Sequence, residues 1–589
     1  MARRDSVMKK PKDARGALKR LVRYLGPFLA VIGVVFVLCV ASNLLALYGP
    51  KLAGLAINEA AAGKGKVDFA KVWYYAKRML ACYVASSLLS IGISVSMMTV
   101  SKRIANRMRA DVFAKLMKLP VGFFDRNQAG DIISRVSYDI DVISTCLATD
   151  ITAILTSLVT VIGSFVMMVV ISPLLALTML ITVPAAIVYT TKMRKITQPR
   201  YVKRSKSYGT MNGFVEEMFS GQKTIAAYAY GDQVNGKFDG INEAAADAFY
   251  DAEYYGCTMG PTVGAINNTG LGLIAVFGSV LFMSGKITLG NISSFVLYSR
   301  KFSGPINEIA NIVNELFSAL AAAERVFGLL DEPVESADAD GAHVLTDVRG
   351  EVDLSHVAFG YDAGRTILHD LSLHADAGKL VAIVGPTGAG KTTIINLLMR
   401  FYDADAGHIA IDGHDIYEST RKSVRGAYAM VLQDTWVFSG TIFDNIAYGK
   451  EGATMDEVVA AAKAARIHGF IMKQPKGYQT VLSEDGGNIS KGQKQLLTIA
   501  RAMLYDAPML ILDEATSNVD TETEREIQRA MRELMKDRTC FVIAHRLSTI
   551  KNADWILVLD HGDVVEQGTH GKLLEKKGFY RRLYMSQFE

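Results

Sequence analysis

Long apolar stretches dominate the first half of the chain. Before about residue 320, apolar residues recur in runs near the ~20 residues that a helix needs to cross the hydrocarbon of a bilayer. We expect six such spans, at residues 27–48, 79–100, 151–171, 174–191, 257–283 and 289–312. This part of the chain is therefore predicted to be an α-helical membrane domain with six spans.

The connections between the expected spans alternate between short and long. Spans three and four are joined by Ser172 and Pro173, whereas about fifty residues separate spans two and three. The long connections are basic, as in SKRIANRMR and TKMRKITQPRYVKRSK, and so is the stretch before span one. Because basic segments remain on the cytoplasmic side of a membrane, we expect both the N-terminus and the C-terminal half in the cytoplasm.

Two of the long connections carry a helical pattern of their own. They contain LPVGFFDRNQAGDIISRVSYDID, residues 119–141, and NGFVEEMFSGQKTIAAYAY, residues 212–230. A turn-prone tip between amphipathic segments suits a helical hairpin that touches another domain. An ordinary solvated hairpin fits the same pattern.

The pattern changes near residue 330. A small, acidic and polar stretch is followed by short apolar runs that alternate with helical patterns, namely KLVAIVG, HIAIDG, MLILDEA, TCFVIAH and DWILVLD. Such runs are typical of strands buried on both faces of an α/β sheet. We therefore divide the chain into a membrane domain at 1–325, a linker at 326–346 and an α/β domain at 347–589.

Composition supports a membrane protein and excludes other classes. Half of the 589 residues are hydrophobic, and the mean hydropathy is +0.20. The formal charge of +5 comes from basic residues beside apolar runs, so it indicates membrane orientation and not nucleic-acid binding. The five cysteines are scattered, which indicates neither a disulfide framework nor a zinc site; they are Cys39, Cys82, Cys146, Cys257 and Cys540.

The motif GPTGAGKTT follows an apolar strand pattern and precedes a helical one. It fits G-x-x-x-x-G-K-[ST], in which glycines let backbone N–H groups wrap a phosphate at a helix N-terminus. We expect Lys391 to reach the outer phosphates of a nucleotide and Thr392 to bind Mg²⁺. The predicted phosphate loop comprises Gly385, Pro386, Thr387, Gly388, Ala389, Gly390, Lys391, Thr392 and Thr393.

Polar residues also end two other apolar runs. In MLILDEATSNVD, Asp513 is placed to hold the Mg²⁺ shell, and Glu514 to polarise an attacking water, the two tasks of phosphoryl transfer to water. His545 follows the run TCFVIA, so we expect it at the same edge of the sheet. A solvated acidic turn fits poorly after the apolar LIL.

Nearly the whole chain resembles half of an ATP-binding cassette (ABC) exporter, in which six membrane helices precede one ATP-hydrolysing nucleotide-binding domain. The resemblance implies that the hairpin tips FFDRNQAGD and EEMFSGQKT are coupling helices. The matching site positions are Tyr361 for the aromatic that stacks on adenine, Gln433 for the glutamine that senses Mg²⁺ and the membrane domain, Asp513 for the Mg²⁺ aspartate, Glu514 for the catalytic base, Asp520 for the loop after it and His545 for the switch histidine.

The segment ISKGQ matches the family's signature, usually Leu-Ser-Gly-Gly-Gln, which contacts the γ-phosphate bound on the opposite chain. The match keeps Ser490, Gly492 and Gln493, but Lys491 replaces the first glycine. In bacterial heterodimeric multidrug-type exporters, an altered signature commonly accompanies a retained catalytic glutamate. The resemblance therefore implies a heterodimer with one competent site, whose other chain has an ordinary signature and lacks the glutamate. A lysine that points to solvent in a homodimer is the alternative.

The sequence leaves the cargo open. Polar residues in or near the spans either line a cavity or pair helices; they are Asn43, Asn267, Asn268, Asn311 and Asn314. The resemblance implies ATP-driven export of an amphipathic small molecule, drug or lipid across a bacterial cytoplasmic membrane by alternating access. A lipid flippase, an ATP-gated channel and a regulatory ATPase that moves no cargo are the alternatives. The intact Glu514 favours turnover over gating.

Overall fold

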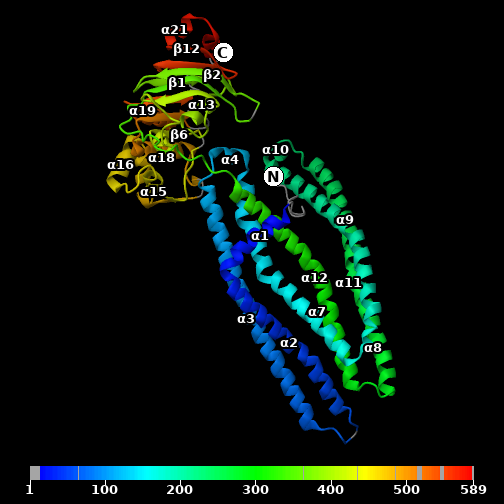
Figure 1. The fold of residues 1–589 in the computed structure, drawn as a ribbon. Helices are drawn as coiled ribbons and strands as arrows, with labels where there is room; N and C mark the ends of the chain where they lie inside the picture. The colour runs from blue at the N-terminus through cyan, green and yellow to red at the C-terminus, as the bar shows by residue number, and fades with distance from the viewer. Residues whose placement is uncertain are drawn as a thin grey trace. The chain divides into compact units, whose positions relative to one another are not determined.

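The chain forms two compact units, one entirely helical and one with strands and helices (Figure 1). The computed structural model describes residues 13–586 apart from 64, 363, 434, 484–485, 514–519 and 544–549. The first unit contains the residues up to Leu119 together with Asn127–Pro333. The second contains Pro120–Arg126 and the chain from Val334 onward.

Long helices make up the first unit (Figure 1). They are α1 (Ala14–Leu25), the 3-10 turn η2 (Gly26–Phe28), α2 (Leu29–Ala60), α3 (Phe69–Leu116), α5 (Ala129–Ser134), the π-helix η3 (Arg135–Asp139), α6 (Ile140–Thr145), the π-helix η4 (Cys146–Asp150), α7 (Ile151–Ile171), α8 (Pro173–Ala176), α9 (Met179–Ser220), α10 (Gln222–Ala227), α11 (Gly231–Met283) and α12 (Leu289–Asp331).

Within the described residues, five helical stretches are long and apolar enough to cross a membrane. They cover the first five predicted spans, and they are Ala14–Ala60, Phe69–Leu116, Ala129–Ile171, Pro173–Ser220 and Gly231–Met283. Helix α12 runs through the sixth predicted position as one helix but is not among the five. Arg300 and Lys301 lower the hydropathy of α12, so the sixth span stays a prediction.

Helix α2 packs against α3, α7 and α12. Polar side chains join these helices, because a polar group in an apolar setting needs a partner. The Tyr298 hydroxyl of α12 donates to the Leu47 carbonyl of α2 at 2.6 Å. Thr160 of α7 donates to the Asn43 side chain of α2 at 3.0 Å. Asn43 therefore pairs two helices.

The second unit is built on a six-stranded sheet with the order β12-β11-β3-β10-β9-β6. The five strands from β11 to β6 pair in parallel, and β12 pairs antiparallel with β11. Predicted strands KLVAIVG, MLILDEA, TCFVIAH and DWILVLD are confirmed in this sheet. The strands are β3 (Leu380–Val384), β6 (Tyr428–Val431), β9 (Met509–Asp513), β10 (Thr539–Ile543), β11 (Trp555–Asp560) and β12 (Asp563–Gly568).

The run HIAIDG forms a strand of a different sheet from the one predicted. It contributes to β4, in an antiparallel sheet with the order β2-β1-β4-β5. Ile409 and Ile411 are fully buried, whereas the residues between and before them are more exposed, the alternation of a strand with one covered face. These strands are β1 (Val352–Phe359), β2 (Leu368–Ala375), β4 (Ala406–Ile411) and β5 (His414–Asp415).

Helices pack against the sheets around two main cores. One core lies between the two large sheets and includes α13; the other joins the parallel sheet to α15, α16, α18 and α19. The remaining elements are α4 (Val121–Arg126), α13 (Lys391–Leu398), α14 (Arg421–Gly426), β7 (Gly440–Thr441), α15 (Ile442–Ala447), α16 (Met455–Ala464), α17 (His468–Met472), the 3-10 turn η5 (Gly477–Gln479), β8 (Val481–Leu482), α18 (Lys491–Tyr505), α19 (Thr521–Met535), α21 (His570–Glu575) and α22 (Phe579–Ser586).

Candidate nucleotide-binding site

Three predicted site elements meet at one edge of the parallel sheet. Strand β3 leads directly into Gly385, β9 ends at Asp513, and β6 ends two residues before Gln433. Because these strands are parallel, their carboxyl ends lie at the same edge, where α/β sheets bind ligands. The fold therefore gathers the phosphate loop, Asp513 and Gln433.

Glycines set the path of the phosphate loop. Gly390 has a φ of 100° and forms the left-handed N-cap of α13, a conformation that costs glycine little. At Gly385, an added Cβ would lie 2.3 Å from the Leu559 carbonyl oxygen, so a side chain there would push the loop off the sheet. The loop thus wraps closely around the N-terminus of α13, where backbone N–H groups and the helix dipole favour a phosphate.

Lys391 lies over this loop and is largely buried. Its ammonium donates to the carbonyl oxygens of Gly385 at 2.8 Å and Pro386 at 2.9 Å. Burial lowers the pKa of Lys391, and the charge of Asp513 acts in the opposite direction. Two of the three ammonium donors are therefore engaged by the loop itself. A phosphate held in the loop would accept from the third.

The donor set at this edge fits Mg²⁺. Thr392 is exposed in the first turn of α13, whereas the neighbouring Thr393 hydroxyl accepts from Tyr361 at 3.3 Å. Thr392, Asp513 and Gln433 offer a hydroxyl, a carboxylate and an amide oxygen, the hard ligands that Mg²⁺ takes together with water and phosphate. Their roles toward the metal stay a prediction.

Tyr361 belongs to a cluster of three aromatic rings. Its ring meets Phe359 and Tyr402 nearly edge-on, with centroids 5.0 Å away in both cases. Its hydroxyl accepts from the Asn396 side chain at 3.0 Å. The ring is thus fixed in orientation yet 41% exposed, as a ring that stacks on a base requires.

The signature segment begins α18, in the helical part of the second unit. Ser490 caps this helix, with its hydroxyl accepting from the Gln493 N–H at 3.2 Å and its own N–H donating to the Gln493 side chain at 2.9 Å. This reciprocal pair is a capping box. Lys491 is exposed and Gly492 is buried. The structure therefore presents Ser490 and Lys491 at a helix N-terminus.

Two predicted catalytic residues, Glu514 and His545, lie outside the described residues. Asp520 is described and caps α19, accepting from the Thr523 N–H at 2.9 Å. The hydrogen bonds from Thr523 lower the pKa of Asp520.

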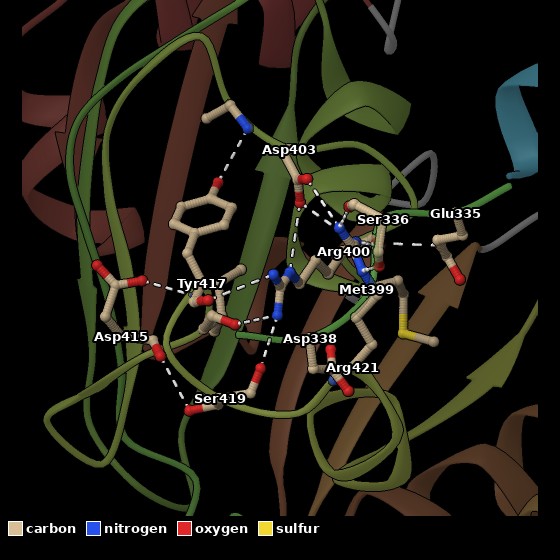
Figure 2. Close-up of polar contacts among 12 residues, drawn as sticks. Glu335, Ser336, Asp338, Met399, Arg400, Asp403, Asp415, Tyr417, Ser419 and Arg421 are labelled. Atoms are coloured by element: carbon tan, nitrogen blue, oxygen red, sulfur yellow. Dashed lines mark hydrogen bonds and ion pairs between the residues drawn. The ribbon is translucent and has the colours of Figure 1, made fainter. Parts of the chain in front are cut away.

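The C-terminal end of α13 is held by an arginine network that reaches the linker (Figure 2). Arg421 donates to Asp403 at 2.8 Å and to the Ser336 hydroxyl at 2.6 Å. Arg400, the second residue after α13, donates to the carbonyls of Ile416 at 2.6 Å and Ser419 at 2.7 Å. One end of α13 thus forms the phosphate loop, and the other end is anchored beside the linker.

Comparisons with known proteins agree with both units. The family described as "ABC transporter transmembrane region" matches residues 32–306, and the family described as "ABC transporter" matches residues 368–517. A "Fatty acid ABC transporter ATP-binding/permease protein" of Mycobacterium tuberculosis is 45% identical over 521 residues, covering 88% of this chain and 82% of that protein. This chain belongs to the ABC transporter family.

Two further comparisons bear on this ABC transporter. An "ATP-dependent lipid A-core flippase" of Syntrophus aciditrophicus is 34% identical over 84% of this chain and 82% of its own length. The structure of a bacterial Atm1-family ABC exporter with ATP bound superposes with a TM-score of 0.75 at 30% identity, covering 96% of this chain and 98% of that one. The chain is therefore an ABC exporter half, with a membrane domain and an ATP-binding domain that couples ATP hydrolysis to transport.

Tyr402 and Asp125 of this ABC exporter could not be recognised as site residues from the sequence. Tyr402 follows α13 in a stretch that reads as ordinary core, and Asp125 lies in a hairpin 277 positions away. No spacing rule connects two such distant positions.

Proposed function

We propose that this ABC exporter moves an amphipathic lipid or drug-like molecule out of the cytoplasm by alternating access, powered by ATP with Mg²⁺. The membrane is the cytoplasmic membrane of a bacterium, with the N-terminus and the nucleotide-binding domain inside. ATP drives the cycle because it binds the closed state of the dimer more tightly than the open state.

An apolar slot in the membrane unit supports the proposed class of substrate. It lies between α2 and α7 and has a volume of about 730 Å³, within the range of small-ligand sites. Its lining is Ala41, Leu44, Leu45, Leu47, Tyr48, Gly163, Val166 and Met167. Such a wall suits an acyl chain or a fused ring and gives a charged solute little to bind. The relatives named for a fatty acid and for lipid A-core point the same way.

The test is transport in vesicles. We expect proteoliposomes to move a fluorescent fatty acid or phospholipid when given Mg-ATP, and vanadate to stop this movement. Lys391→Ala should abolish transport, since it removes the cation at the outer phosphates, provided that the partner's site is inactivated too. Lys379→Ala, which removes a surface lysine paired with Asp554, is the matched control.

A second variant tests the slot. Ala41→Phe fills it and should reduce lipid movement severalfold more than Ala30→Phe, which adds the same ring to an exposed position of α2. Equal transport by both variants would exclude the slot. A passive ion current that persists in Lys391→Ala vesicles would favour the ATP-gated channel, and ATP hydrolysis without movement of any cargo would favour a regulatory ATPase.

The signature segment supports a proposal for how this chain assembles with a second half-transporter. A lysine in the first turn of a helix opposes the helix dipole, which favours anions there, and α18 has no acidic residue in that turn. An ATP phosphate on an opposing chain would supply the missing anion. Lys491 together with the retained Glu514 supports pairing with a second, different half-transporter that has an ordinary signature, so that this chain's own signature closes the slower of two ATP sites. A homodimer in which Lys491 faces solvent is the alternative.

A further inference from the structure

Helix α4, the tip of the first cytoplasmic hairpin, packs as part of the nucleotide-binding unit. The Tyr402 hydroxyl donates to the Asp125 carboxylate of α4 at 2.6 Å. A Cβ added at Gly122 would lie 2.9–3.2 Å from the Tyr402 ring, so the backbone of α4 lies close against the ring. Burial and the hydrogen bond to Asp125 raise the pKa of Tyr402 well above its ordinary value.

The same tyrosine ring touches the predicted adenine contact. The Tyr402 and Tyr361 rings lie at an interplanar angle of 87°, the edge-to-face arrangement that aromatic pairs prefer. Phe359 contacts both rings. Tyr402 therefore donates a hydrogen bond to α4 through its hydroxyl and packs edge-to-face against Tyr361 through its ring.

The backbone that carries Tyr402 is held independently of α4. Arg400 and Asp403 flank this residue closely, and both belong to the arginine network of Figure 2. Arg400 is only 5% exposed and sits at a φ of 49°, a conformation that persists when surrounding contacts enforce it. A movement of α4 would consequently turn the Tyr402 side chain and leave its backbone in place.

We propose that Tyr402 is a positioning residue that orients the adenine-facing ring of Tyr361 when α4 is docked on it. The inference rests on the proposed adenine contact of Tyr361. Docked α4 then strengthens ATP binding, and by linkage bound ATP strengthens the docking of α4 by the same factor.

Steady-state ATP hydrolysis by the full-length transporter, in lipid nanodiscs with whichever half-transporter copurifies with it, tests this inference. Tyr402→Phe removes the donor of this hydrogen bond and Asp125→Ala removes its acceptor, and both variants keep an aromatic ring at position 402. Each should raise the KM for ATP about threefold to tenfold, the change expected for the net loss of one ordinary hydrogen bond. The double variant should match the single ones, because both remove the same contact.

Two controls separate positioning from folding. Tyr505→Phe removes a different phenol hydrogen bond of the same domain, the one to the Gly426 carbonyl, and Asp131→Ala removes another acid of the same hairpin. Neither should change the KM. A purely structural role of Tyr402 would lower the melting temperature and leave the KM unchanged.

The outcomes distinguish the positioning role of Tyr402 from the adenine contact of Tyr361. An unchanged KM in Tyr402→Phe and Asp125→Ala, with a raised KM in Tyr361→Ala, would overturn the positioning role and leave the adenine contact standing. An unchanged KM in Tyr361→Ala would overturn both. Additive effects in the double variant would show that the two residues act separately, against the proposal.

Discussion

At the scale of single residues, Tyr361 gives the most direct test of the nucleotide site. Tyr361→Ala should weaken ATP binding by roughly 1–3 kcal/mol, the usual value of stacking a base on an aromatic ring, and should change turnover less. Tyr361→Phe keeps the ring but loses the hydrogen bonds to Asn396 and Thr393, so its effect should be smaller. Titration with a fluorescent ATP analogue measures both. Equal affinity in wild type and Tyr361→Ala would leave Tyr361 as a ring that only packs against Phe359 and Tyr402.

Residues of the phosphate loop were predictable from sequence, and their neighbours were not. The glycines and Lys391 follow a spacing that the backbone itself requires, since a phosphate must be wrapped by consecutive N–H groups. Tyr402 obeys no such rule, because its contacts depend on how distant parts of the chain pack. Arg400 likewise makes its buried hydrogen bonds with the loop near Ser419. No local sequence pattern predicts these contacts.

At the scale of elements, strongly patterned segments were predicted best. Five apolar runs became long helices, because backbone polar groups in lipid must bond within their own segment. Polar residues in α12 lower the hydropathy of the sixth apolar run, so this run is less distinct in the sequence. The strand β4 was placed in the wrong sheet, since a short apolar run does not reveal whether one face or two will be covered.

The arginine network between the end of α13 and the linker gives the prediction at this scale. Burial raises the pKa of Asp403, but its hydrogen bonds with Arg421 and the charge of Arg400 outweigh this effect and hold the pKa below its ordinary value. The carboxylate therefore stabilises the fold above the unfolded pKa of about 3.9. That contribution disappears as the pH falls through the lower folded pKa.

Asp403→Asn should thus lower the melting temperature by about 2–4 °C at pH 7, as expected for the loss of about 1 kcal/mol in a domain of this size. Wild type and variant should converge as the pH falls below about 4. Thermal melts of the detergent-solubilised protein between pH 3 and 7 measure this difference. Asp376→Asn, at an exposed carboxylate beside His374, is the control. A difference as large at pH 3 as at pH 7 would contradict the charge-based origin.

At the scale of the whole molecule, the question is whether two equivalent chains assemble. An ATP site that faces the signature of another chain makes hydrolysis a property of the dimer. This chain combines Lys491 with Glu514. In the proposed heterodimer, its own phosphate loop belongs to the site with a complete set of hydrolytic residues, and its altered signature belongs to the other site.

Two substitutions in the purified complex, together with the activity of this chain alone, test the proposed heterodimer. Glu514→Gln should remove nearly all steady-state ATP hydrolysis, because the partner's phosphate loop serves a site that turns over slowly or not at all. Lys491→Gly should change hydrolysis by less than about twofold, because it alters the signature that closes this slow site. A homodimer in which Lys491 faces the opposite chain's ATP would instead place this lysine at both active sites, so Lys491→Gly would change the rate of the whole enzyme. A homodimer in which Lys491 faces solvent would keep its rate in Lys491→Gly and is distinguished by the number of turnover sites. Full ATP-driven transport by this chain alone, with two equivalent turnover sites, would establish that homodimer.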